Sequence, residues 1–397
     1  MLVFFICSCS CIRPVFLIPG TMASVLKGTV HNRSINPYCP SHSEDMTFWI
    51  DRKSIIPPFV NCYADWLTLE YDEKSDLIVN RSGVSIYPSD FGGVEGINWL
   101  DESLFNINFI PYFSEYTRSL LKMGYEIKKT LFGCPFDWRL GLALPQYHWE
   151  RVKNLVEKAF YANNYTKVVL IGHSLGAYFI QRLLTKFTTY EWRNKYIDST
   201  ILVAPSWSGS GYAFSALWEG KIPNLGPLGN DMQMARFIRS IGGVHIHLPN
   251  HQVYGNTSII YTNEGKPLMA KDVPRYLLNN KAFTKQEQQI LHKNLDMFSK
   301  LPGEIDIPTA IIYNSAISTL RGYNFENDQK LYGPGDGMVN AEGIEYACKK
   351  WKRKPYCKNI RSKSILHNHL TMLYAPSCVN LVLSLLKDDK WKNPEFR

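Results

Sequence analysis

Short apolar runs alternate along most of the chain with stretches whose apolar residues recur at helical spacing. Runs rich in β-branched residues predict strands buried on both faces, and the spaced stretches predict helices packed against them. The alternation predicts an α/β protein with a mostly parallel sheet and helices on both faces. The predicted strands cover residues 13–20, 126–131, 167–171, 198–204, 308–314 and 362–366, and the predicted helices cover 109–124, 149–161, 177–184 and 378–387.

Two segments depart from this alternation. Residues 31–66 are loop-like and aromatic, and their apolar side chains would either contact lipid or pack inward. Residues 210–303 have the size and position of a cap inserted after a central strand. The predicted organisation is an α/β core in residues 13–30, 67–209 and 304–397, interrupted by a lid insert in residues 31–66 and a cap in residues 210–303.

The strand at 167–171 runs directly into Gly172-His-Ser174-Leu-Gly176, a G-x-S-x-G pattern. When a helix follows, this pattern is typical of the nucleophile elbow of the α/β-hydrolase fold, which lifts one serine hydroxyl out of the sheet. Small neighbours are needed because a side chain there would collide with the turn. The pattern occurs often by chance, but the flanking strand and helix favour Ser174 as a catalytic nucleophile.

A serine nucleophile needs a base within hydrogen-bond reach and an acid that orients the base. Hydrolases of this type carry them in the chain order serine, acid, histidine. After the strand at 308–314, a glycine-rich turn would point the carboxylate of Asp336 at the site. After the strand at 362–366 come His367 and His369, either of which could be the base.

Composition describes an ordinary globular protein, with 45% hydrophobic and 20% charged residues among 397. The net charge of +9 is densest in residues 349–363. That stretch is either a solvated loop or a surface with affinity for anionic membranes. The excess charge is not gathered in a long basic helix, so we predict no nucleic-acid partner.

The first twelve residues are apolar and end in small residues, which favours a short signal peptide over residues 1–12. They lack a charged start, so a buried first strand is the alternative. No other run approaches the roughly 18 to 20 apolar residues of a membrane span. Four N-glycosylation sequons fit secretion, at Asn32, Asn80, Asn164 and Asn256.

Two pairs of cysteines enclose loops, Cys39 with Cys62 and Cys348 with Cys357. Both loops could close as disulfides in an oxidising compartment. Neither pair has zinc-finger spacing with partner histidines, so we predict no metal.

The chain resembles the lecithin:cholesterol acyltransferase family, which includes lysosomal phospholipase A and the phospholipid:diacylglycerol acyltransferases. The matching runs follow the family order over nearly the whole chain. The most diagnostic run is Pro135-Phe-Asp-Trp-Arg-Leu140, because generic lipases lack it. The other runs are residues 14–20, 47–51 before Cys62, 91–93 with Leu100 and Asp101, 171–176, 204–205 with Gly209, 335–336 and 369–372.

The resemblance implies roles for individual residues. It makes Ser174 the nucleophile, Asp336 the acid and His369 the base, because the family's base precedes a Leu- or Ile-x-Met pattern. It makes the backbone amides of Leu175 and Met22 the oxyanion donors. Met22 falls where the family usually has Leu, which matters little for a main-chain donor.

The resemblance also describes the lid. The loop from Cys39 to Cys62 matches the family's cystine-closed lid, in which Phe48, Trp49 and Ile50 would contact lipid. A second family disulfide usually starts from the strand before the acid. The strand at 308–314 has no cysteine, and Cys348 with Cys357 is the substitute that we expect.

The implied activity is acyl transfer from a glycerophospholipid through an acyl-serine to a sterol, another lipid alcohol or water, without a cofactor. Expected partners are a phospholipid membrane or lipoprotein surface and a lipid acceptor. The expected location is extracellular or lysosomal, peripheral on membranes. Three alternatives stay open: a triacylglycerol or general carboxylic-ester lipase of the same fold, a non-catalytic secreted lipid-binding protein, and a basic protein that binds nucleic acid or glycans.

Overall fold

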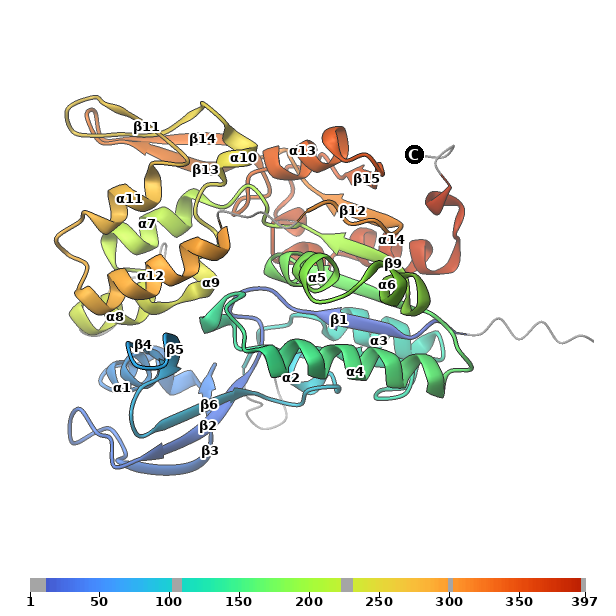
Figure 1. Ribbon diagram of the computed structural model, residues 1–397, viewed down its shortest axis with the longest axis horizontal. Coiled ribbons are helices and arrows are strands. Elements are labelled where there is room, and N and C mark those ends of the chain that lie inside the picture. The colour runs from blue at the N-terminus through green and yellow to red at the C-terminus, as the bar shows by residue number, and fades with distance from the viewer. Residues whose placement is uncertain (1–11, 102–108, 223–230, 299–302, 394–397) are drawn as a thin grey trace, which may run out of the picture.

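A computed structural model describes residues 12–101, 109–222, 231–298 and 303–393 (Figure 1). The predicted signal peptide over 1–12 lies outside these residues except for Ile12. None of the described helices combines the length and the apolar character that a membrane span requires.

The centre of the molecule is a six-stranded sheet in the order β15-β12-β9-β8-β1-β7. Every neighbouring pair in it is parallel, which confirms the predicted α/β fold class. Such a sheet is buried on both faces, and every residue of β8 and β12 is buried accordingly. The strands are β1 (Val15–Ile18), β7 (Leu131–Gly133), β8 (Val168–His173), β9 (Ile197–Val203), β12 (Thr309–Tyr313) and β15 (Tyr356–Asn359).

Helices cover both faces of this sheet. Side chains alternate along a strand, so Phe16 and Ile18 of β1 belong to one hydrophobic cluster, and Val15 and Leu17 belong to another. The first cluster includes residues of α4 (Gln146–Ala162), α5 (Leu175–Lys186), α6 (Tyr190–Tyr196) and α13 (Glu342–Lys350). The second includes residues of α2 (Glu95–Asn98), α3 (Ser114–Lys122) and α14 (Pro376–Lys387).

The segment 31–66 is not the loop that its sequence predicts. It contains β3 (His42–Trp49), the turn η1 (Arg52–Ile55) and most of α1 (Phe59–Leu67). β3 pairs antiparallel with β2 (Leu26–His31), which also pairs with β6 (Val84–Pro88). Most residues of β3 are polar, and only Thr47 and Phe48 are buried, so no hydrophobic alternation marks this strand in the sequence.

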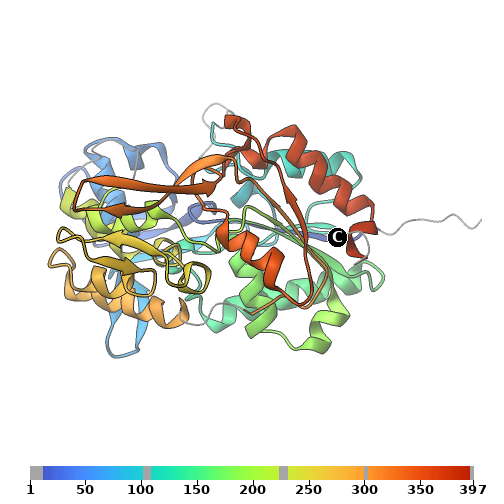
Figure 2. The same cartoon turned by 90° about the horizontal axis from the view of Figure 1, so that it is seen from above.

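The cap forms a second lobe beside the core (Figure 1, Figure 2). Its four-stranded sheet has the order β11-β10-β13-β14. β13 and β14 come from the segment assigned to the last part of the core, so that segment also completes the cap. The elements are α7 (Gly211–Glu219), α8 (Asp231–Ser240), α9 (Gly242–His245), α10 (His251–Tyr254), α11 (Val273–Leu278), α12 (Lys285–Phe298), β10 (Ser258–Tyr261), β11 (Pro267–Met269), β13 (Ile317–Asn324) and β14 (Gln329–Gly335).

Three predicted elements differ in the structure. Residues 126–130 form a turn that leads into β7, which starts at Leu131. The helix predicted from 109 begins at Ser114, because the backbone of residues 110–113 bonds instead to residues 97–100. The strand predicted at 362–366 is wrong. The edge strand is β15, and its lysine and partly exposed side chains give it no apolar pattern that predicts a strand. Residues 365–367 form the short 3₁₀ helix η3 (Ile365–His367).

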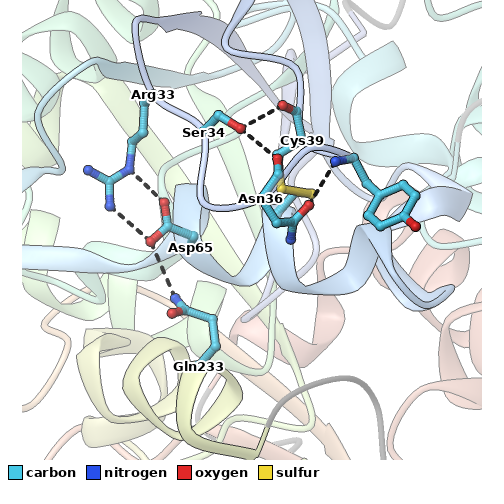
Figure 3. The surroundings of a disulfide bond; sticks show 8 residues. Arg33, Ser34, Asn36, Cys39, Asp65 and Gln233 are labelled. Carbon is cyan, nitrogen blue, oxygen red and sulfur yellow. Dashed lines mark hydrogen bonds and ion pairs between the residues drawn. A yellow bond between two sulfur atoms is a disulfide. The ribbon is translucent and has the colours of Figure 1, made fainter.

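Both expected disulfides are present, Cys39–Cys62 and Cys348–Cys357. The first joins the connection between β2 and β3 to α1. Around it, Arg33 donates two hydrogen bonds to the buried carboxylate of Asp65, at 2.6 and 2.9 Å (Figure 3). The same carboxylate accepts a bond from Gln233 of α8, so this cystine lies where the β2–β3 hairpin meets the cap.

We expect the two disulfides to contribute unequally to stability. Cys39–Cys62 spans 23 positions and Cys348–Cys357 spans 9, and the longer loop loses more entropy on closure. Replacing Cys39 and Cys62 by Ser should lower the unfolding free energy by about 3 kcal/mol. The pair Cys348→Ser, Cys357→Ser is the control, and urea unfolding should show a smaller loss. A larger loss in the control would contradict the loop-entropy explanation.

Candidate active site

The serine of the elbow has strained backbone geometry. β8 ends at His173, α5 starts at Leu175, and Ser174 between them has φ 55° and ψ −120°. Gly176 lies so close to β1 that an added Cβ would come within 2.2 Å of the carbonyl oxygen of Ile18. The crowded turn therefore needs glycine at 176, and it presents the Ser174 side chain at the end of the sheet where strands β1 and β8 terminate.

Three side chains from distant parts of the chain form one hydrogen-bonded series. The Oγ of Ser174 lies 2.9 Å from Nε2 of His369, and Nδ1 of His369 lies 2.7 Å from Oδ2 of Asp336. All three residues are buried. The other carboxylate oxygen of Asp336 accepts bonds from the amides of Met338 (3.0 Å) and Val339 (2.8 Å). The carboxylate is thus oriented toward the imidazole.

The second candidate base lies elsewhere. His367 contacts the hydroxyls of Ser362 (2.9 Å) and Ser377 (2.8 Å), outside the cavity that holds Ser174. The structure therefore brings His369, and not His367, to the serine.

Two backbone amides flank the same site. Leu175 is the first residue of α5, and the first N–H groups of a helix have no acceptor within the helix. Met22 has φ 60°, and its carbonyl accepts a 2.7 Å bond from the indole N–H of Trp49. Met22 and Ser174 line one cavity. The geometry suits an anionic oxygen held between the loop after β1 and the start of α5.

The Asp-Trp-Arg run packs against the loop after β1 and against Trp49. Trp138 packs edge-on against Trp49 at 5.2 Å between ring centroids, and its N–H donates to the carbonyl of Ser24. Arg139 is fully buried and makes two bonds to Asp137, at 2.9 and 2.6 Å. A buried guanidinium is tolerated only when it is paired in this way. The diagnostic run is therefore a rigid support for Trp49 and, through it, for Met22.

A buried network that the sequence analysis missed joins the loops of the site. The amide of Gly20 donates to the hydroxyl of Tyr112 (2.9 Å), which contacts Nδ1 of His173. Nε2 of His173 contacts the carbonyl oxygen of His369 (2.9 Å). Burial, and secondarily the nearby His369, hold the pKa of His173 well below its usual range, so its ring is neutral. Nε2–H then donates to His369, and Nδ1 accepts from Tyr112.

A cavity of about 430 Å³ opens at Ser174 and His369. Its wall is mostly apolar, and the core, the β2–β3 hairpin and the cap all contribute to it. Trp49 and Ile50, two of the three residues for which lipid contact was predicted, line it. Phe48 does not, because it is fully buried against Trp66, so it is not available for the predicted lipid contact. The apolar lining from the cap comprises Ala213, Ala216, Ile222, Ile238 and Val244.

The cavity contains no cluster of possible metal ligands among the described residues. The one group of three such side chains found in the described ranges is His31, His42 and Glu44, none of which lines the cavity.

The fold and this site define a member of the α/β-hydrolase class. The family model described as "Lecithin:cholesterol acyltransferase" matches residues 45–313. The chain belongs to the lecithin:cholesterol acyltransferase family, as its sequence resemblance indicated. Fold and family are those of lipid acyltransferases and phospholipases.

Three curated relatives cover most of the chain. "Lysosomal phospholipase A and acyltransferase" of Rattus norvegicus is 25% identical over 91% of this chain and 87% of its own length. "Phosphatidylcholine-sterol acyltransferase" of Rattus norvegicus is 23% identical over 94% of this chain and 82% of its own. "Lecithin-cholesterol acyltransferase-like 1" of Arabidopsis thaliana is 26% identical over 84% of this chain and 82% of its own length.

We expect Tyr112→Phe to destabilise the protein. The change leaves the buried amide of Gly20 and Nδ1 of His173 without their partner, which should cost about 1–3 kcal/mol of unfolding free energy. Tyr116→Phe is the matched control, because the buried hydroxyl of Tyr116 has no partner in the described structure. Urea unfolding of both variants tests this, and equal losses would count against the network.

Stability should fall as the pH drops from about 6.5 to about 4. Burial lowers the pKa of His148, His245 and His247 from 6.5 to about 4. In this window the unfolded chain binds protons that the folded protein does not. Each histidine therefore contributes stability above its unfolded pKa that is lost on acidification, at about 1.4 kcal/mol per pH unit.

His148→Phe should reduce the slope of unfolding free energy against pH in this window by the contribution of one histidine, about 1.4 kcal/mol per pH unit. Its ring lies among Phe91, Trp149 and Phe179, and its Nε2 has no partner in the described structure, so an aromatic replacement fits. Urea unfolding at several pH values measures both slopes. An unchanged slope would show that His148 is not a source of the acid sensitivity.

Proposed function

We propose that this protein transfers a fatty acyl group from a glycerophospholipid, through an acyl enzyme on Ser174, to a sterol, another lipid alcohol or water. The observation that carries the proposal is the series from Ser174 Oγ through His369 to Asp336, at 2.9 and 2.7 Å, opening into an apolar cavity. The names of the phospholipase and sterol acyltransferase relatives support the substrate class.

In the first step, His369 takes the proton of Ser174 as Oγ attacks the ester carbonyl. Asp336 holds the imidazole with Nε2 unprotonated toward the serine, and stabilises the imidazolium that forms. The negative oxygen of the tetrahedral intermediate is held by the amides of Met22 and Leu175, each worth about 3 kcal/mol. The ester C–O bond then breaks, and the imidazolium gives its proton to the departing lysophospholipid oxygen.

In the second step, His369 takes a proton from the acceptor hydroxyl, whose oxygen attacks the acyl-serine. The Ser174 ester bond breaks, and the proton returns to Oγ. A lipid alcohol yields an ester and water yields a free fatty acid. The chemistry is the same for both acceptors, so the choice depends on which molecule reaches the acyl-serine.

The surroundings of the site support action at a lipid surface. Substrate acyl chains would leave a phospholipid membrane or lipoprotein surface and enter between Trp49, Ile50 and the cap. Two disulfides favour an oxidising compartment, either extracellular or a lysosome-like lumen. Three of the four sequon asparagines, Asn32, Asn164 and Asn256, are exposed, which is compatible with glycosylation there.

Ser174→Ala should abolish both fatty-acid release and ester formation from labelled phospholipid vesicles, because it removes the attacking oxygen. His369→Ala should lower the rate by at least about 10³-fold. His367→Ala is the matched control from the same loop and should stay within about twofold of wild type, since its imidazole bonds Ser362 and Ser377 outside the cavity. Retained turnover in Ser174→Ala would overturn the proposal.

The same assay with and without sterol in the vesicles separates the two acceptors. A sterol-dependent rise in labelled ester at the expense of free acid supports acyl transfer, and free acid alone supports phospholipase activity. Hydrolysis of triacylglycerol emulsions with no action on phospholipid would instead favour a neutral-lipid lipase.

A further inference from the structure

We propose that His31, His42 and Glu44 form a surface binding site for a divalent transition-metal ion such as Zn²⁺. The two histidines lie directly opposite each other in the antiparallel register of β2 and β3. Glu44 lies two residues beyond His42, so its side chain is on the same face of β3. This proposal does not depend on the enzymatic function, since none of the three residues lines the active-site cavity.

The distances between the three side chains suit one small ion. The Nδ1 atoms of His31 and His42 are 3.2 Å apart. Oε1 of Glu44 lies 3.6 Å from Nε2 of His31 and 3.5 Å from Nε2 of His42. One potential ligand atom from each residue fits within 4.8 Å of the others. Bonds of about 2.0–2.1 Å in a tetrahedron place ligand atoms about 3.4 Å apart. Binding would therefore draw one nitrogen of each ring and a carboxylate oxygen together from within 4.8 Å.

The charge of the cluster also favours a cation. The only ion-pair partners found for Glu44 among the described residues are the two imidazoles, which carry no charge when unprotonated. The neighbouring Asp45 pairs instead with Lys27, at 4.0 Å. A divalent ion would neutralise the carboxylate of Glu44 and would bind one nitrogen of each imidazole.

The connection between the two histidines is held in place, which lowers the entropy cost of binding an ion. Ser34 Oγ donates within this connection toward the carbonyls of Asn36 (2.7 Å) and Cys39 (2.8 Å) (Figure 3). The cystine and the Arg33–Asp65 ion pair tie the same connection to α1. The proposed metal ligands therefore lie at an end of the β2–β3 hairpin that is held in place by these bonds.

The ligand set selects the class of metal. Two imidazole nitrogens and one carboxylate oxygen suit zinc and its neighbours, whereas calcium and magnesium prefer oxygen ligands only. All three residues are exposed, so water completes the coordination. Bound zinc would clamp β2 to β3 at the end of the hairpin opposite Trp49, because β3 runs from His42 to Trp49.

The test is calorimetric titration of the EDTA-treated, dialysed full chain with ZnCl₂ at about pH 7.5. We expect one equivalent of zinc to bind, and His31→Ala or His42→Ala to weaken the affinity at least about tenfold. His292→Ala is the matched control, an exposed histidine on α12 outside the cluster, and should bind as wild type does. MgCl₂ should give no binding.

Two further measurements complete the test. Zinc should raise the thermal midpoint of wild type but not of the double variant His31→Ala, His42→Ala, whose midpoint in EDTA shows whether it folds normally. Binding should weaken at about pH 5, because protons compete for imidazole nitrogens. Absence of zinc binding by folded wild type, or equal affinity in the double variant, would overturn the proposal.

Discussion

The hydrogen bond from His173 to the main-chain carbonyl of His369 joins the two loops on which the site depends. One loop is the elbow after β8. The other comes after the edge strand β15, almost two hundred residues later in the chain. Tyr112 extends the contact to Gly20, two residues before Met22. Because these groups are buried, an unmade bond would be costly, and the loops are held in one arrangement.

The two inserted parts of the chain form much of the wall of the cavity at Ser174. The hairpin of β2 and β3 brings Trp49 over Met22, and the Asp-Trp-Arg run supports Trp49 from the core. The cap supplies much of the apolar wall. Asp336 directly follows β14, which belongs to the cap's sheet, so the cap is physically coupled to the contact between Asp336 and His369.

Local patterns were good guides where one short segment carries the information. The buried strands β8, β9 and β12, the elbow at Ser174 and the glycine turn at Asp336 were all readable, because burial on both faces and tight turns leave few residue choices. The strand β3 was not, since its stability comes from pairing with β2 and not from an apolar face. The strand β15 was missed for a related reason, as it is an edge strand with polar positions.

By itself, the sequence determined the parallel core and predicted the elbow at Ser174, the glycine turn at Asp336 and, through the family resemblance, the choice of His369 over His367. Only the tertiary structure brought Nε2 of His369 to Ser174, buried Phe48 while leaving Trp49 and Ile50 on the cavity, and brought Tyr112 to His173. The physical reason is that buried strands and tight turns depend on residues that are neighbours in the sequence. A hydrogen bond between residues 61 positions apart, or a cavity wall shared by three parts of the fold, arises only when those parts pack together.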